Sequence, residues 1–548
     1  MMNLHWKFWL VGLAAPSVVL TAPSLVPAVS AERHSATTSV TVLEPDRYRH
    51  YIALFQRQEQ EATGKPGSDS WPWMLAQIPW FESSDKNFDE IYYFRWYAWQ
   101  KHVVTTPRGF VITEWLPRPE AKDGFFGALP DAAPFHLSEA GWLRDRRIAE
   151  DDARYWLSPD AEPRKYSFWV ADSVRAITLA NGDRHLASEL LPSLKTNYHA
   201  WEASNQDANG LFWQIDTRDG MEKSISGDGY RPTLNSYMYG DAVAISELAA
   251  ATGDAATQKE FGAKAAALRR LVEEKLWNPR DQFYESVSPA LDSGIRKQKK
   301  FVDPGTVLAF SGVRELTGYI PWQFKIPAPE HAVAWKQLLD PQGFAGKYGA
   351  TTAERRSPRF RFASSDQCTW NGPSWPYATT QTLLALANLL ETQTQPYIGA
   401  NDYYRLFAAY VLSQHLKLPT GRVIAWIDED LDADTDEWIA KNILLAKNKD
   451  VGRGNYYNHS GFADPLITGL VGLRPRMDDR IVLRPLLPAG TWTYFAVDGL
   501  PYHGHLLTIL YDKTGKQYRR GPGMTLLVDG AKRASRSDLG PLEYRLPN

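Results

Sequence analysis

The sequence predicts a mainly α-helical protein that ends in a small antiparallel β domain. From about residue 48 to residue 475, amphipathic segments of helix length alternate with long loops rich in Gly, Pro, Asp and Trp. After about residue 476 the pattern changes to short β-rich runs separated by turn residues. The composition, with 44% hydrophobic and 23% charged residues, is typical of a folded globular protein and excludes wholesale disorder.

Residues 1–31 have the features of an export signal. Lys7 is their only charged residue, an apolar run follows it, and residues 29–31 (VSA) form a small-residue cleavage site. We therefore expect a mature chain that begins at Glu32 and is periplasmic or secreted. The single cysteine, Cys368, excludes an intramolecular disulfide, and we interpret it as a buried, inert thiol.

The predicted helical part covers residues 32–475. Its clearest segment is 256–277, where apolar residues recur at the spacing of one helix face. Segment 237–252 repeats that face, and Gly253 follows where a helix would end. The helix-length segments that we single out are 88–102, 142–157, 167–181, 185–204, 237–252, 256–277, 373–391 and 401–416.

The predicted β domain, which we describe as β-sandwich-like, covers residues 476–548. Its runs combine β-branched, aromatic and leucine residues, and turn residues such as Asp-Gly and Thr-Gly lie between them. The runs are 481–487, 493–497, 505–511, 524–528 and 542–546.

Charge and aromatic content narrow the class of function. Lys and Arg (61) nearly balance Asp and Glu (63), so there is no strong field that would favour a nucleic-acid partner or an anionic membrane. The chain nevertheless has 21 Trp and 26 Tyr. Most of these are expected in the core, but aromatic rings beside carboxylates in loops are typical of carbohydrate sites, where sugar faces stack on flat rings.

Three loops have this combination. They are residues 211–239, 366–377 and 424–464, and they carry acids beside Trp, Tyr and Gly. Glycoside hydrolysis needs two carboxyl groups, one to protonate the leaving oxygen and one to activate water or to attack the sugar. The first and third loops can supply one each.

Short motifs in these loops resemble those of clan G glycoside hydrolases, which group family 37 trehalases with family 63 glucosidases and mannosylglycerate hydrolases. Residues 220–224 (GMEKS) resemble the G-W-D-x-S motif of the clan. Residues 370–375 (WNGPSW) resemble its W-R-G-P-x-W segment, and residues 429–435 (EDLDADT) resemble its E-x-Y-D-P-x-T segment. The three motifs occur in the order found in the clan.

This resemblance implies an (α/α)6 toroid that acts by inversion, with Glu222 as general acid and Glu429 as general base. The chain differs from the clan pattern because Glu222 stands where the clan usually has Asp, and Asp219 is an alternative acid three residues away. Asn371 replaces the Arg of the clan, so direct sugar contacts are expected to differ there.

The candidate substrate-binding residues are polar or aromatic side chains in these loops and near the segment 88–102. For His459, sugar binding and capping of the following segment are equally compatible with the sequence, and for Asp85 the alternative is surface capping. The candidates are Trp213, Arg218, Asp219, Tyr230, Trp370, Asn371, Trp375, Trp426, Tyr456, Asn458, His459, Asp85 and Arg95.

No cofactor or metal is expected. The run Asp430, Asp432 and Asp434 resembles the start of a calcium loop, but Thr435 occupies the glycine position and Lys441 the position of the final glutamate. The sequence also lacks H-E-x-x-H, P-loop and G-x-S-x-G motifs. We therefore expect a carbohydrate as the partner, with no nucleic acid and, after signal cleavage, no membrane.

The sequence leads to the hypothesis of an exported, exo-acting and inverting glycoside hydrolase. A polysaccharide lyase on the same architecture is the nearest alternative, and a new C=C absorbance would identify it. A non-catalytic sugar-binding protein would bind without releasing reducing sugar, and a phosphorylase would depend on phosphate.

Overall fold

The computed structural model describes residues 42–118, 125–289, 307–361, 368–447, 449, 452 and 454–547. The expected signal peptide and the start of the mature chain at Glu32 lie outside these residues.

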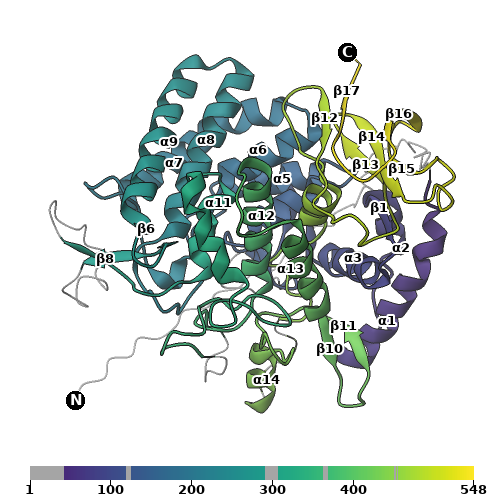
Figure 1. The fold of residues 1–548 in the computed structure, drawn as a ribbon, viewed down its shortest axis with the longest axis horizontal. Coiled ribbons are helices and arrows are strands. Elements are labelled where there is room, and N and C mark those ends of the chain that lie inside the picture. The colour runs from purple at the N-terminus through teal and green to yellow at the C-terminus, as the bar shows by residue number, and fades with distance from the viewer. Residues whose placement is uncertain are drawn as a thin grey trace, which may run out of the picture. The chain divides into compact units, whose positions relative to one another are not determined.

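Most of the described chain before residue 475 consists of helices joined by long loops (Figure 1). The helices are α1 (Arg49–Thr63), α2 (Trp71–Gln77), α3 (Lys86–Trp99), α4 (Ala133–Ala140), α5 (Arg147–Trp156), α6 (Val170–Asn181), α7 (His185–Asn205), α8 (Pro232–Thr252), α9 (Ala255–Leu276), α11 (Ile320–Gln323), α12 (Pro376–Thr392), α13 (Ala400–Ser413), α14 (Ile439–Ala446) and α15 (Ala463–Pro465).

These helices pack in series. Contacts run from α4 to α6, from α6 to α8, and then through α11 and α12 to α13. Helix α13 in turn contacts α3, near the beginning of the described chain. The outer helices α7 and α9 pack on α8. The mainly α, (α/α)6 toroid class predicted from the sequence is therefore confirmed.

Local sequence explains where the best-predicted helices begin and end. The carboxylate of Asp254 accepts a hydrogen bond from the backbone N–H of Thr257 and so caps α9. The apolar face predicted for 256–277 is buried along α9. Helix α8 begins at Pro232, five residues before the predicted start, because proline fits the first turn, and it ends at Gly253 with φ 83°.

The β domain is built around a five-stranded antiparallel sheet of order β1-β13-β14-β15-β16. The strands are β1 (Trp80–Ser83), β13 (Tyr494–Tyr502), β14 (His505–Asp512), β15 (Gly523–Val528) and β16 (Ala531–Arg536). Strands β12 (Arg480–Leu483) and β17 (Leu542–Arg545) form a separate antiparallel pair. The sheet thus includes one strand, β1, from the helical part of the sequence.

Short antiparallel strands shape the loops between the helices. They are the hairpin β2 (Val103–Thr106) and β3 (Gly109–Ile112), the sheet β4 (Trp213–Gln214), β5 (Gly229–Tyr230), β8 (Val287–Pro289) and β9 (Leu308–Phe310), and the pairs β6 (Trp277–Asn278) with β7 (Phe283–Tyr284) and β10 (His415–Lys417) with β11 (Val423–Ala425). In the described ranges, no helix combines the length and the apolar character needed to cross a bilayer.

Candidate active site

Loops from distant parts of the chain enclose a cavity of about 150 Å³. Both predicted catalytic residues, Glu222 and Glu429, line it, together with the predicted binding residues Trp370, Trp375 and His459. The complete lining is Glu114, Trp115, Leu129, Asp131, Tyr166, Gly220, Glu222, Cys368, Trp370, Trp375, Tyr377, Glu429, Tyr457 and His459.

The turn that carries Glu222 is held by a buried carboxylate, Asp216. This carboxylate accepts hydrogen bonds from the backbone N–H of Lys223 at 2.5 Å and from the Ser224 hydroxyl at 2.6 Å. Gly220 precedes Glu222 with φ 77°, and a Cβ added there would lie 3.0 Å from the Tyr377 hydroxyl oxygen. A glycine is therefore needed both for the left-handed backbone and for the close approach to Tyr377.

The loop that carries Glu429 is joined to the predicted WNGPSW motif. Leu431 and Ser374 exchange two backbone hydrogen bonds of 2.9 Å each, forming an isolated bridge. Glu429 is 1% exposed, and its backbone N–H donates to the Asp428 carboxylate at 2.9 Å. Two of the three motifs are thus fixed to one another by main-chain bonds, which holds Glu429 against the aromatic wall of the cavity.

Glu114 and Asp131 are two further carboxyl groups in the cavity, and sequence reasoning missed both. Glu114 follows strand β3 and Asp131 precedes α4. Burial and the neighbouring Asp131 raise the pKa of Glu114 well above its ordinary value, and burial raises the pKa of Asp131 to about 6. The adjacent Trp115 was a usable signal for Glu114, because an acid beside a tryptophan in a loop is the criterion that selected the other loops.

The environment of Glu222 favours its protonated form near neutral pH. Burial raises the pKa of Glu222 to about 7, and the negative charge of Asp131 adds to this effect. The Cys368 thiol donates a weak hydrogen bond to Glu222 Oε2, with 3.6 Å between sulfur and oxygen. A carboxylic acid with such a pKa can donate a proton at neutral pH.

Cys368 differs from its prediction in burial but agrees with it in reactivity. It is half-buried rather than fully buried, and it lines the cavity beside Glu222. Burial and the nearby Glu222 raise the pKa of its thiol well above the ordinary value, so it remains a thiol and is a poor nucleophile.

Aromatic side chains form the walls of the cavity. The rings of Trp370 and Trp375 are stacked, with centroids 4.0 Å apart and planes 12° apart. The Trp375 Nε1–H donates to the Thr369 carbonyl oxygen at 3.0 Å, which fixes the orientation of that ring. Flat rings oriented in this way can pack against the C–H face of a sugar.

His459 contributes a neutral ring to the same cavity. It stacks on Tyr457, with centroids 3.9 Å apart. Burial, and secondarily the charge of Arg95, lower the pKa of His459 well below its ordinary value. Arg95 itself lies outside the cavity and donates to the Tyr410 hydroxyl at 2.7 Å and to the Ser460 carbonyl at 2.5 Å. It therefore supports the loop that carries His459.

Several predicted substrate-binding residues do not line the cavity, and hydrogen bonds or ring packing account for many of them. They are Trp213, Arg218, Asp219, Tyr230, Asn371, Trp426, Tyr456, Asn458, Asp85 and Arg95. Asp85 caps α3 through the N–H of Asn87, at 3.1 Å. The Asn458 amide donates to the Thr113 carbonyl at 3.1 Å.

Asp219, the alternative acid, is engaged in a buried ion pair. Its Oδ2 lies 2.5 Å from Arg231 Nε, and both side chains are fully buried. The hydroxyls of Ser167 and Thr233 also donate to this carboxylate. Asp219 thus stabilises the loop beneath Glu222 and does not line the cavity.

The aromatic candidates outside the cavity pack against other side chains. Trp213 meets Tyr230 edge to face at 5.2 Å, and the Tyr230 hydroxyl donates to the Asp207 carboxylate. Trp426 and Tyr456 pack together with centroids 5.6 Å apart, and Lys441 lies over the Trp426 ring.

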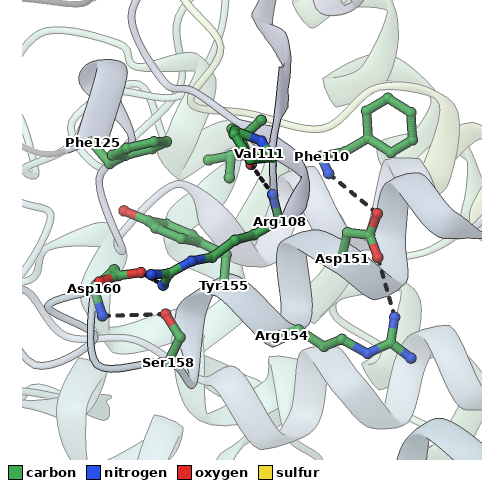
Figure 2. Close-up of a pocket in the computed structure, with 11 residues that line it drawn as sticks. Arg108, Phe110, Val111, Phe125, Asp151, Arg154, Tyr155, Ser158 and Asp160 are labelled. Carbon is green, nitrogen blue, oxygen red and sulfur yellow. Dashed lines mark hydrogen bonds and ion pairs between the residues drawn. The ribbon is translucent and has the colours of Figure 1, made fainter. Parts of the chain in front are cut away.

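A larger cavity of about 580 Å³ lies between the β2–β3 hairpin and α5 (Figure 2). Its carboxylates are paired: Asp160 binds Arg108, and Asp151 binds Arg154 at 3.2 Å. The same stretches of chain, residues 106–115, 125–131 and 155–166, contribute to both cavities. Because its acids are held by arginines, this second cavity is less suited to proton transfer than the smaller one.

Among the residues that the structure describes, no cluster of three or more His, Cys, Asp or Glu side chains is arranged to hold a metal. In the calcium-like run, Asp430 accepts from the Ala440 N–H at 3.0 Å, and Asp434 binds Arg355 at 2.8 Å.

A mainly α toroid whose loops gather carboxyl groups and stacked tryptophans defines a carbohydrate-active enzyme. Residues 126–460, more than half of the chain, match the family model of the mannosylglycerate hydrolase MGH1-like glycoside hydrolase domain. The chain belongs to this family and is a glycosidase. Residues 473–532 match the C-terminal domain of glycosyl hydrolase family 65. Lyase chemistry and binding without catalysis are thereby disfavoured.

Several solved structures are similar to this chain. A protein named sialidase is 38% identical with a TM-score of 0.82, and the match covers 92% of this chain but only 45% of that one. The GH63 mannosylglycerate hydrolase from Thermus thermophilus in complex with glucose is 14% identical over 64% of this chain and 98% of its own, with a TM-score of 0.44. The α-L-rhamnosidase from Dictyoglumus thermophilum is 12% identical over 80% of this chain and 43% of its own, with a TM-score of 0.47.

Proposed function

We propose that this glycosidase removes a terminal sugar by inversion, with Glu222 as general acid and Glu429 as general base. The observation that carries the proposal is that these two carboxyl groups, predicted from loops far apart in the sequence, line one small aromatic cavity. Two carboxyl groups on opposite sides of a glycosidic bond are the minimum that this reaction needs.

In the proposed reaction, Glu222 transfers its proton to the glycosidic oxygen while the bond from that oxygen to the anomeric carbon breaks. Glu429 accepts a proton from a water molecule, whose oxygen bonds to the opposite face of the same carbon. The products are the free alcohol and a sugar of inverted anomeric configuration. Proton exchange with solvent then returns Glu222 to the acid form and Glu429 to the carboxylate.

The volume of the cavity supports exo action. A protein cavity of about 150 Å³ can hold a benzene-sized six-membered ring. The present cavity has about the same volume, which suits one terminal pyranose better than an internal segment of a polysaccharide.

We further propose that residues 1–31 direct export to the periplasm or the medium. Recovery of the chain only from the cytoplasm, still beginning at Met1, would contradict this proposal.

The pH dependence of activity tests the role of Glu222. Because Glu222 must be protonated and its pKa is raised to about 7, kcat/KM should fall above about pH 7, approaching tenfold per pH unit. Replacing Asp131 by Asn removes the negative charge that helps to raise this pKa, so the alkaline limb should move to lower pH. Initial rates between about pH 5 and pH 9 locate the alkaline limb of the pH profile for the wild-type enzyme and for Asp131→Asn. Glu437→Gln, an exposed change in the Glu429 loop, is the control; an unmoved limb in Asp131→Asn would argue against the coupling.

The stereochemistry of the product tests the mechanism. The enzyme should hydrolyse at least one member of a panel of aryl α- and β-glycosides that includes glucosides, mannosides, rhamnosides and arabinosides. Proton NMR during the first minutes should show the anomer opposite to that of the substrate, before mutarotation. A first-formed product of retained configuration would contradict inversion and make one carboxylate a nucleophile.

The names of the relatives suggest two substrate classes. A sialidase and a mannosylglycerate hydrolase are among the similar structures, and the chain spans less than half of the sialidase. Sialosides and mannosylglycerate both carry a carboxylate. Either would therefore place a negative charge in or beside the cavity of this chain.

A further inference from the structure

We infer that the active site is selective for an uncharged terminal sugar, held by Glu114 and Asp131 through its hydroxyl groups, and that it rejects sugars that carry a carboxylate. This inference rests on the proposed function, because it names the substrate class of the same cavity.

The lining of the cavity is acidic. Four of the lining side chains are carboxyl groups, and none of the described lining residues is Lys or Arg. Recognition of a carboxylate or phosphate in proteins normally uses Arg, Lys or a set of N–H donors. Burial raises the pKa of Glu114 and of Glu222, so the negative charges of the cavity are those of the proposed base Glu429 and, above about pH 6, of Asp131. A buried anion placed here would face these charges without a compensating cation among the described lining residues.

Two cations act electrostatically on residues that line the cavity, and neither is suited to bind such an anion. Lys223 acts on the lining residue Cys368, but its side chain is exposed and does not line the cavity. Arg95 acts electrostatically on His459 but does not line the cavity, and its guanidinium already donates to Tyr410, Gln414 and Ser460. The His459 ring itself is neutral.

Two carboxyl oxygens in the cavity are available to bind sugar hydroxyl groups. Glu114 Oε2 and Asp131 Oδ1 are buried and accept no hydrogen bond from an N–H, or from the hydroxyl group of another side chain, of the described chain. Among the described residues, the only side-chain partner of the Asp131 carboxyl group is the neighbouring carboxyl group of Glu114, with which it can share a proton. Both side chains line the cavity, and the other oxygen of Glu114 accepts from the Tyr457 hydroxyl. Buried polar atoms of this kind are normally satisfied by a partner. A sugar hydroxyl, which both donates and accepts, can satisfy a carboxylate oxygen or a protonated carboxyl group.

The shape of the cavity agrees with a neutral ring. Its volume is about 150 Å³, and the stacked Trp370–Trp375 pair supplies an apolar wall for the C–H face. The remaining walls supply hydroxyl and carboxyl groups of Tyr166, Glu114 and Asp131. Every recognition element is thus directed at hydroxyls and C–H groups.

Matched pairs of aryl glycosides test the inference. In each pair the neutral hexoside and the uronide have the same ring and differ only in CH₂OH or COO⁻ at C5, for the gluco, manno and galacto series; an aryl rhamnoside, an aryl sialoside and mannosylglycerate complete the set. We expect the best neutral substrate to exceed the best anionic one by at least about 100-fold in kcat/KM. Inhibition constants of the free neutral sugars and uronic acids give the same comparison without turnover.

A charge-removing variant separates electrostatics from shape. Asp131→Asn should lower absolute rates but narrow the neutral-to-anionic ratio by about tenfold, since one negative charge is removed. Glu260→Gln, an exposed change on α9, should leave the ratio unchanged. An unchanged ratio in Asp131→Asn would overturn the electrostatic basis of the selectivity.

The outcomes distinguish this inference from the proposed function. Comparable cleavage of uronides, sialosides or mannosylglycerate would overturn the inference and leave the glycosidase mechanism intact. Binding of neutral sugars in preference to anionic ones, with no glycoside cleaved, would support the selectivity and overturn the proposed catalysis. Neither cleavage nor preferential binding of neutral sugars would overturn both.

Discussion

Replacing Glu222 by Gln is expected to lower kcat/KM about 1,000-fold for a glycoside whose leaving group is a poor one, such as an alkyl alcohol or a second sugar. The amide cannot protonate the glycosidic oxygen, so the alkoxide would have to leave with its full negative charge. With a dinitrophenyl leaving group, which needs little protonation, the loss should shrink to about tenfold or less. Rates for a series of leaving groups measure this dependence.

The fold should tolerate this change. Burial raises the pKa of Glu222 to about 7, so about half of this group is already a neutral acid at pH 7, and Gln has nearly the same shape. The midpoint of thermal unfolding should therefore change little. Glu260→Gln on the surface of α9 is the matched control and should keep full activity. Equal losses for good and poor leaving groups would show that Glu222 is not the general acid. Near-normal rates would show that Glu222 takes no part in catalysis.

Replacing Glu429 by Gln is expected to lower kcat/KM by about 1,000- to 10,000-fold for every leaving group. The missing function is deprotonation of the attacking water, which a better leaving group does not replace. Azide needs no deprotonation, so millimolar azide should restore part of the turnover and form a glycosyl azide of inverted configuration. Product NMR and initial rates with and without azide measure these effects.

Glu437→Gln provides a control within the same loop. Glu437 is exposed, and its replacement should change neither the rate nor the response to azide. A glycosyl azide of retained configuration from Glu429→Gln would instead make Glu429 the acid/base catalyst of a retaining mechanism. An undiminished rate in water would show that another residue activates the nucleophile.

Helices α8 and α9 were predictable because their signals are local. The face of α9 and the glycine after α8 follow from residues within one element. Most strands of the β domain also coincide with predicted runs. Strand β16 was missed because it is an edge strand with mostly exposed, polar residues, AKRASR, and therefore lacks apolar alternation. Strand β1 was missed because its four buried residues are too few to define a period, and its partner β13 lies far away in the sequence.

The sequence predicted only some of the tryptophans that line the cavity. Sequence position beside a carboxylate selected Trp213, Trp370, Trp375 and Trp426 as candidate sugar contacts. Only Trp370 and Trp375 of these line the cavity, together with Trp115, which was not selected. Proximity in sequence does not determine which side of a loop a ring faces, since that depends on the elements packed against it.

The sequence by itself determined the helical class, the terminal β strands and the two loops that carry Glu222 and Glu429, because short motifs and periodic patterns encode them. Only the tertiary structure decided which acids share a cavity: it brought Glu114 and Asp131 to Glu222 and engaged Asp219 with Arg231. The reason is that the pKa and availability of a carboxyl group depend on burial and on charges within a few ångströms, and these neighbours come from segments far apart in the chain.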